Sequence, residues 1–272
     1  SGVLAAQAIL RSGDERACER LLPAIAEGRA VAALAWADVH GWSPRGSGVR
    51  ASGGAGDWTL SGTAHHVLEG DTADVLLAVA VTDAGTVGLF EVDTATGVRR
   101  EHTPSMDTTL RLARVDFQRA PARPLCLDAG ALLAALYDIA AVAVTALQVG
   151  GARRGLDMTV AHTRERVQFG RPIGSFQALK HRMADLLVEV ESARSASWAA
   201  AWSGARGAEE LARGAASAKA WCSEAFTAVA AETVQMHGGI AITWEHDAQM
   251  VFKRAHATAQ LFGQPHERRR RL

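Results

Sequence analysis

The spacing of hydrophobic and polar residues divides the chain into three stretches. In residues 3–29, apolar side chains recur at helical intervals, and the punctuation at Gly13 and Pro23 predicts a short helical hairpin. In residues 31–124, short apolar runs alternate with turn residues, which is typical of β-strands. After Pro124, apolar positions recur every three or four residues, which predicts long amphipathic helices to the end of the chain.

Three patterns stand out in the β stretch. The apolar runs Val75–Val81 and Val87–Val92 flank a short glycine-containing turn and therefore predict a β-hairpin. Trp58–Leu60 predicts a strand that ends in a turn at Ser61-Gly62. The high density of glycine from Gly41 to Gly62 predicts a loop.

Two of the later helices each carry one apolar stripe that faces a core. The first stripe consists of Phe176, Leu179, Met183, Leu186, Leu187 and Val190, and the second of Leu211, Ala215, Ala218, Cys222, Ala225, Phe226 and Val229. Many of the neighbouring residues are alanines, which allow helices to pack closely. The order of elements is therefore α, then β, then a bundle of long helices.

Composition excludes several classes of function. The 29 basic residues balance the 29 acidic ones, so no net field attracts nucleic acid or an anionic membrane. The basic run Arg268–Arg271 is expected to be a solvated tail. The three cysteines show neither disulfide nor metal-ligand spacing, which favours a reducing, cytoplasmic compartment and no metal site.

No membrane span and no signal peptide are expected from the sequence. The longest apolar stretch, Ala129–Val149, is interrupted by Tyr137, Asp138 and Gln148, so it predicts a buried helix. The first residues lack a basic region followed by an apolar block.

Two segments carry candidate chemistry. Arg166–Gln177 includes Phe169-Gly170-Arg171-Pro172 between two long helices, where an arginine beside exposed backbone amides can hold a pyrophosphate. A plain corner between helices with a solvated arginine is the alternative. Gln235–Thr243 contains Gly238-Gly239 after a helix, which either lets a ligand approach the backbone closely or simply caps the helix.

Together these segments resemble the acyl-CoA dehydrogenase family. The matching stretches run from Leu156 to Asp185 and from Gln235 to Ala255, and Trp58–Thr63 fits the same family further upstream. The resemblance covers nearly the whole chain. It implies an α+β fold with partial N-terminal helices in residues 1–30, a β-barrel-like middle domain in residues 31–124 and a C-terminal four-helix bundle in residues 125–272. It also implies that most of the family's N-terminal domain is absent.

The resemblance further implies a cofactor and a reaction. The family holds FAD at a subunit interface and oxidises an acyl-CoA thioester to the 2,3-enoyl-CoA, passing electrons to an acceptor. A carboxylate removes the α proton while a hydride passes to the flavin. Carried over by motif, the groups that contact the adenine and pyrophosphate side of a neighbouring subunit's FAD are Arg166, Gln168, Phe169, Gln235, Gly238 and Gly239.

The chain departs from the family at the catalytic base. The two positions at which members carry the glutamate fall at or beside Ala140 and at Phe262. Asp138 lies two residues from the first position, about 200° around a helix, and is a displaced candidate. Glu245 and Asp247 lie at the start of the last predicted helix, where acidic residues favour the helix dipole. The catalytic residue is therefore unassigned.

The middle stretch departs too. The family's Thr-Glu pair that reaches the flavin ring becomes Ala37-Asp38. An aromatic residue and a threonine that the family places near the same ring become His66 and Leu68. His65 and His66 should point to opposite faces of a strand and so do not form a metal pair.

Positions that serve the chain's own flavin ring are thus altered, while those that serve a neighbour's flavin are kept. Some actinobacterial members are α2β2 heterotetramers that act on CoA thioesters of steroid side chains. The resemblance therefore favours the partner subunit of a heteromeric acyl-CoA dehydrogenase. A self-sufficient homo-oligomer that uses Asp138, and a non-enzymatic scaffold or truncated homologue, remain alternatives.

Overall fold

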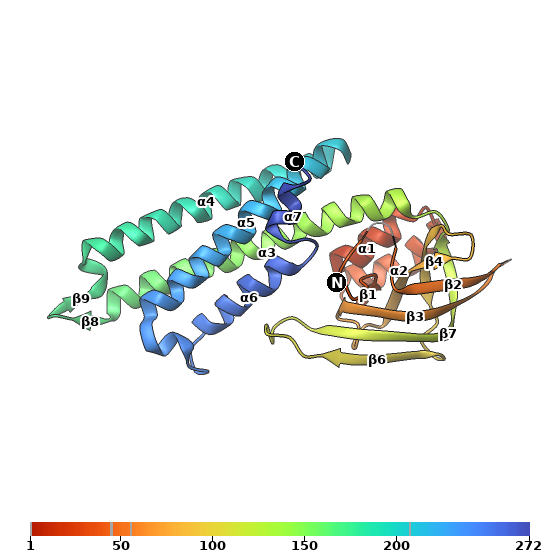
Figure 1. Cartoon of the computed structure of the whole chain (residues 1–272), viewed down its shortest axis with the longest axis horizontal. Helices are drawn as coiled ribbons and strands as arrows, with labels where there is room; N and C mark the ends of the chain where they lie inside the picture. The colour runs from red at the N-terminus through yellow and green to blue at the C-terminus, as the bar shows by residue number, and fades with distance from the viewer. Residues whose placement is uncertain (1, 44–45, 55, 207) are drawn as a thin grey trace. The chain divides into compact units, whose positions relative to one another are not determined.

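The computed structural model describes residues 2–43, 46–54, 56–206 and 208–272 (Figure 1). The chain forms two compact units, Ser1–Ala140 and Ala141–Leu272, and the division falls inside helix α3. In order, the elements are α1 (Gly2–Arg11), α2 (Glu15–Ala26), β1 (Ala32–Ala35), β2 (Val49–Gly54), β3 (Asp57–Leu68), β4 (Val75–Thr82), β5 (Val87–Val92), β6 (Val98–Thr103), β7 (Leu112–Cys126), α3 (Gly130–Glu165), β8 (Val167–Gln168), β9 (Arg171–Pro172), the 3-10 turn η1 (Ile173–Ser175), α4 (Gln177–Arg206), α5 (Ala208–His237), the 3-10 turn η2 (Gly238–Ile242), α6 (Ala248–Gln260) and α7 (Pro265–Arg269).

The first two helices form the predicted hairpin. Gly13, with a φ of +81°, lies between them, and the Asp14 side chain caps α2 by accepting from the Ala17 amide at 2.9 Å. Pro23 lies inside α2 and does not end it, contrary to the expectation that it punctuates the hairpin. The helix therefore continues for three residues beyond a position that lacks an N–H donor.

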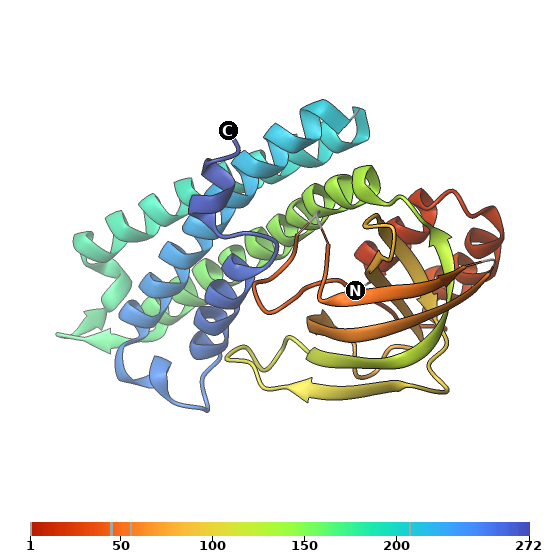
Figure 2. The same ribbon diagram turned by 45° about the vertical axis from the view of Figure 1, so that its right-hand side comes forward.

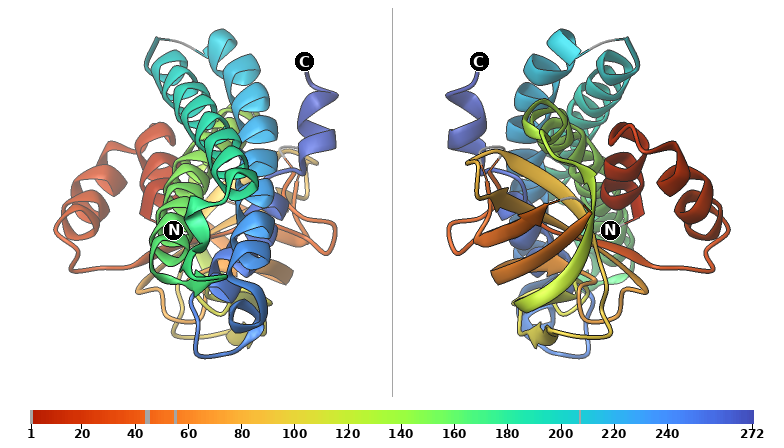
Figure 3. Two further views of the ribbon diagram at one scale, coloured as in Figure 1. Left: turned by 90° about the vertical axis from the view of Figure 1, so that its left-hand side faces the viewer. Right: turned by 90° about the vertical axis from the view of Figure 1, so that its right-hand side faces the viewer.

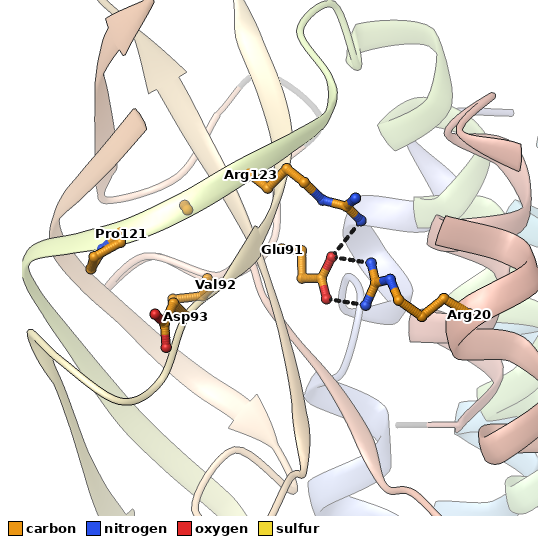
Figure 4. Close-up of a pocket in the computed structure, with 7 residues that line it drawn as sticks. Arg20, Glu91, Val92, Asp93, Pro121 and Arg123 are labelled. Atoms are coloured by element: carbon orange, nitrogen blue, oxygen red, sulfur yellow. Dashed lines mark hydrogen bonds and ion pairs between the residues drawn. The ribbon is translucent and has the colours of Figure 1, made fainter. Parts of the chain in front are cut away.

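An ion-pair cluster ties α2 to the sheet (Figure 4). Arg20 donates two bonds of 2.6 Å to the two carboxylate oxygens of Glu91 on β5, and Arg123 of β7 donates a third at 2.8 Å. Burial opposes ionisation of Glu91, but the two guanidinium groups outweigh it and lower the pKa of this carboxyl. The cluster lines a shallow pocket of about 320 Å³ and serves to hold α2 in place.

The seven described strands of the first unit make one barrel-like sheet. Its strand order is β1-β4-β2-β3-β7-β5, and an additional pairing of β4 with β5 closes part of this path into a ring. β6 extends the sheet beside β7, and Figure 2 shows how β2, β3 and β7 curve together. The core inside is apolar and includes Leu60, Leu76 and Phe90. The predicted hairpin is confirmed as β4 and β5, which pair antiparallel.

The predicted turn at Ser61-Gly62 is wrong. β3 runs straight through it, with only a register shift between Leu60 and Ser61. Gly62 has a φ of +128°, and a Cβ there would lie 2.3 Å from the Gly48 carbonyl oxygen. The glycine thus serves close approach between neighbouring strands. The glycine-rich stretch predicted as a loop likewise contains β2 and the start of β3, while its residues 44, 45 and 55 lie outside the described part.

The second unit is helical, and Figure 3 shows its helices from two opposite sides. Both predicted stripes face the core; all members of the second are buried, with Phe226 fully so. Leu187, predicted in the first stripe, is 44% exposed and lies outside the buried face. The α+β class with a barrel-like sheet and a helical C-terminal region is therefore confirmed.

Helix α3 carries buried polar groups that pair with its neighbours. Thr145 bonds Ser197 of α4 at 2.8 Å, and Gln148 donates to Ser223 of α5 at 2.9 Å. An 18-residue window of α3 has a mean hydropathy of 1.9, which is enough for a membrane span by length and composition. The polar interruptions were expected to exclude a span, and by this criterion they do not. Core helices pass the same test, and the buried hydrogen bonds of α3 to α4 and α5 are typical of a helix packed among other helices.

The basic run at the C-terminus is not a solvated tail throughout. Arg268 is fully buried, and its Nε and Nη2 donate to the Phe262 carbonyl at 2.9 and 2.7 Å. Beside it, the buried Lys219 ammonium donates to the carbonyls of Ala259 and Gly263 at 3.1 and 3.3 Å. Burial, and then the Arg268 charge, lower the pKa of Lys219 to about 7. The Arg268 and Lys219 side chains thus hold the chain that follows α6.

Candidate functional site

The segment between α3 and α4 is a tight β-hairpin. β8 and β9 pair antiparallel, Val167 with Pro172 and Gln168 with Arg171. Phe169 and Gly170 form the two-residue turn with φ values of +53° and +76°, the left-handed pair that a type I′ turn requires. One of the two interpretations of the sequence was a corner where glycine ends a helix, whereas here glycine permits a hairpin turn.

A second aromatic ring, that of Phe176, packs against this hairpin. Phe176 contacts Phe169 edge-on, with ring centroids 6.1 Å apart, and the Arg171 guanidinium lies 4.1 Å from the Phe176 centroid. Sequence reasoning placed Phe176 on the stripe of α4, but it precedes that helix, which begins at Gln177. Its role is to fix the hairpin that presents Phe169.

The hairpin presents its predicted cofactor residues to solvent. Arg166 and Gln168 are exposed, and Phe169 is 91% exposed, more than any other large apolar residue described. The Gln168 amide donates to its own neighbour, the Val167 carbonyl, at 2.8 Å. Within the described ranges, the Arg166 guanidinium forms no ion pair with a carboxylate. An exposed cation and an exposed ring on a rigid turn are suited to a ligand that carries phosphates and an aromatic base.

The second predicted segment follows the end of α5. Gln235 is exposed on the last turn of the helix, and Gly238 has a φ of +67°, the left-handed conformation common just after a helix. The helix-capping alternative therefore describes the backbone correctly. It does not exclude the ligand alternative, because a Cβ at Gly238 or Gly239 would meet nothing within 4 Å. The backbone of both glycines is open to an approaching group.

Two histidine rings bring these segments together. His162 of α3 and His237 of α5 stack with centroids 4.3 Å apart. The Arg166 amide bonds the His162 carbonyl at 2.9 Å, and His237 directly precedes Gly238. The start of the hairpin and the start of the glycine segment are therefore adjacent. The sequence did not single out His237 or His162, because only the packing of α3 on α5 relates them.

The positions expected for a catalytic base are buried and apolar. Ala140 is 3% exposed in α3, and Phe262, which follows α6, is 2% exposed. Asp138, the displaced candidate, is 5% exposed on α3. Asp247 is the N-cap residue of α6, which is not the last helix because α7 follows it; Glu245 is exposed. Neither Ala140 nor Phe262, the positions at which the sequence predicts the family's glutamate, carries a carboxylate.

The altered middle-domain positions lie in the first unit. Ala37 is buried, and its carbonyl accepts from the His65 amide at 2.8 Å. His66 has a φ of +50° beside an irregularity of β3, and its ring lies 6.2 Å from that of His65. The simple alternation of side chains expected here is thus interrupted. Burial, and then His65, lower the pKa of His66.

Comparison with known proteins gives a consistent result. Residues 132–270 match the family model described as "Acyl-CoA dehydrogenase, C-terminal domain". The acyl-CoA dehydrogenase IpdE2 of Mycolicibacterium smegmatis is 48% identical over 208 residues, which cover 76% of this chain and 60% of that protein. The chain therefore spans about three fifths of that relative.

Solved structures agree with the sequence matches. The ChsE4-ChsE5 complex from Mycobacterium tuberculosis superposes with a TM-score of 0.87 at 30% identity, covering 99% of this chain and 72% of the matched one. The steroid ACAD Tcur3481-Tcur3483 superposes with a TM-score of 0.88 at 30% identity, covering 99% of this chain and 73% of the matched one.

Proposed function

The chain belongs to the acyl-CoA dehydrogenase family, and on that premise we propose that it is one subunit of a heteromeric, FAD-dependent acyl-CoA dehydrogenase. In this proposal the complex desaturates an acyl-CoA thioester between C2 and C3. This chain completes a flavin site shared with a homologous subunit, which carries the catalytic carboxylate. An electron-transfer acceptor then reoxidises the complex, and the three free cysteines suit a cytoplasmic location.

One observation carries the proposal. The segments that would serve a neighbour's flavin are exposed and adjacent, whereas Ala140 and Phe262 are buried where the family carries its base. Two structures similar to this chain are of named pairs, ChsE4-ChsE5 and the steroid ACAD Tcur3481-Tcur3483. A CoA thioester of a steroid or its degradation product is therefore the substrate class that we favour.

The residues at the end of the helical unit fit the adenine and diphosphate half of FAD. Arg166 would donate charge-assisted hydrogen bonds to the diphosphate, and Phe169 would lie against an apolar or aromatic surface of the cofactor. Gly238 and Gly239 would let the backbone approach closely, because neither has a side chain. Bound FAD would supply the hydride acceptor for the reaction. This chain's residues contribute binding and orientation.

The replacement Arg166→Ala tests this assignment. Removing a cation that pairs with the diphosphate should lower the flavin content of the co-purified complex, with affinity falling about tenfold or more. The measurement is flavin absorbance per complex, with Arg194→Ala as the matched control because Arg194 is an exposed arginine paired with Glu191. Unchanged flavin content in Arg166→Ala would reject the proposed role of the hairpin.

A further inference from the structure

A third histidine adjoins the stacked pair beside the candidate cofactor segments. The His237 ring stacks on His162 with centroids 4.3 Å apart, and it is tilted by 55° against His246 with centroids 4.7 Å apart. We call the three rings together the stack. The three rings come from the end of α3, the end of α5 and the connection that precedes α6. His237, in the middle, is only 6% exposed. The stack therefore joins the three chain segments that surround the glycines.

Hydrogen bonds define how the protons are arranged. His237 Nδ1 lies 2.7 Å from the Thr233 carbonyl, which can only accept, so Nδ1 carries the proton. Nε2 of the neutral ring is then a bare acceptor, and it is buried without a partner among the described residues. His246 has the opposite tautomer, because its Nδ1 accepts from the Ala248 amide at 3.1 Å.

Burial disfavours protonation of this stack. A proton on His237 Nε2 would place a cation in a buried position with no acceptor, between two further imidazoles. Burial, and then the neighbouring histidines, lower the pKa of His237 and outweigh the hydrogen bond to the Thr233 carbonyl, which raises it. Burial, followed by His246 and Arg166, lowers the pKa of His162.

The charged groups around the stack do not change this result. Glu165 on α3 favours the charged form of His162, but Arg166 opposes it. Asp247, after His246, faces Arg154 of α3 at 4.0 Å, and Glu232 of α5 pairs with Arg182 of α4. Glu245 is exposed. In the described part of the chain, no carboxylate forms an ion pair with any of the three rings.

We propose that His237 is a positioning residue for the cofactor segments, acting through a stack with His162 and His246 that keeps them together only while the rings are neutral. The inference rests on the proposed function. Acidification charges the stack and separates the end of α3 from the end of α5. Because Arg166 follows His162 and Gly238 follows His237, that movement spoils the flavin site. Flavin affinity therefore depends on pH through a group that does not touch the flavin.

The test measures flavin affinity of the complex with its homologous subunit at pH values from about 7.5 down to about 5, by flavin fluorescence. Wild-type affinity should fall about tenfold or more, the change expected from one pKa unit at a linked site. His237→Asn keeps a donor for the Thr233 carbonyl and cannot be protonated, so its affinity should vary less than about twofold. His266→Gln, which changes an exposed histidine of α7, should behave like wild type.

The comparison between variants distinguishes titration of the stack from titration of the partner subunit. Titration of the partner subunit affects every variant equally, so the difference between wild type and His237→Asn is the decisive quantity. The same acid response in both, or none in the wild type, would reject the inference. A complex without flavin at any pH would instead reject the proposed function.

Nuclear magnetic resonance of the histidine side chains in the wild-type complex gives a test that needs no variant. His237 should carry its proton on Nδ1 at neutral pH and should titrate below the ordinary value of about 6.5. A proton on Nε2 at neutral pH, or ordinary titration, would overturn the inference.

Discussion

At the scale of single residues, the buried Arg268 near the C-terminus is expected to contribute to stability. Replacing Arg268 by Ala would leave the Phe262 carbonyl without its two donors and would create a cavity. Together these losses should reduce the free energy of unfolding by about 2–4 kcal/mol.

Urea unfolding of Arg268→Ala, followed by circular dichroism, measures this loss. Arg270→Ala is the control, since Arg270 is exposed, and it should change the free energy by less than about 0.5 kcal/mol. Equal stability of the two variants would show that Arg268 is not part of the core.

The same residues show what sequence can and cannot predict at this scale. Cys222 was expected on a buried stripe, and it is buried, because helical spacing alone determines that face. The four successive arginines Arg268–Arg271 show no helical spacing that would predict a buried face. Which of them is buried depends on how α7 packs against α5, and that is a property of the tertiary structure.

At the scale of elements, the β8–β9 hairpin should depend on its turn glycine. Gly170 has a φ of +76°, with open space around a would-be Cβ, so Gly170→Val introduces backbone strain without a clash. The strain should open the hairpin and weaken flavin binding of the complex about tenfold or more. The helices should keep their stability, because Gly170 packs against none of them.

Flavin affinity and thermal unfolding of Gly170→Val, measured side by side, check this. Gly150→Ala is the control, because this helical glycine of α3 also has open space and has no positive φ. It should leave affinity unchanged and raise helix stability slightly, by about 0.5–1 kcal/mol. Normal flavin affinity in Gly170→Val would show that the hairpin's shape is unimportant for binding.

Elements differ in how far local sequence determines them. β4 and β5 were predicted because the two runs and their turn are contiguous. The turn at Gly62 was predicted wrongly. This glycine allows β3 to approach the backbone of Gly48, which lies just before β2 and is not a sequence neighbour of Gly62. A glycine that permits close approach of strands cannot be distinguished locally from one that permits a turn.

At the scale of the whole molecule, the family motifs identified the class of fold, and the hairpin pattern predicted the pairing of β4 with β5. The pairings of β2 with β4 and of β5 with β7, which complete the ring, became evident only from the structure. The candidate site was predicted in part. Its glycines and arginine lie in recognisable motifs, but the stack of His162, His237 and His246 joins positions with no regular spacing. Packing of three separate segments creates it.

The most direct test of the central proposal is the visible flavin absorbance of this chain, purified alone and co-expressed with a homologous subunit. The shared-site account predicts flavin only in the co-expressed complex, and bleaching of that flavin by an acyl-CoA thioester. Flavin bound by this chain alone and bleached by the thioester would contradict it, and would direct the search for a base to the buried Asp138.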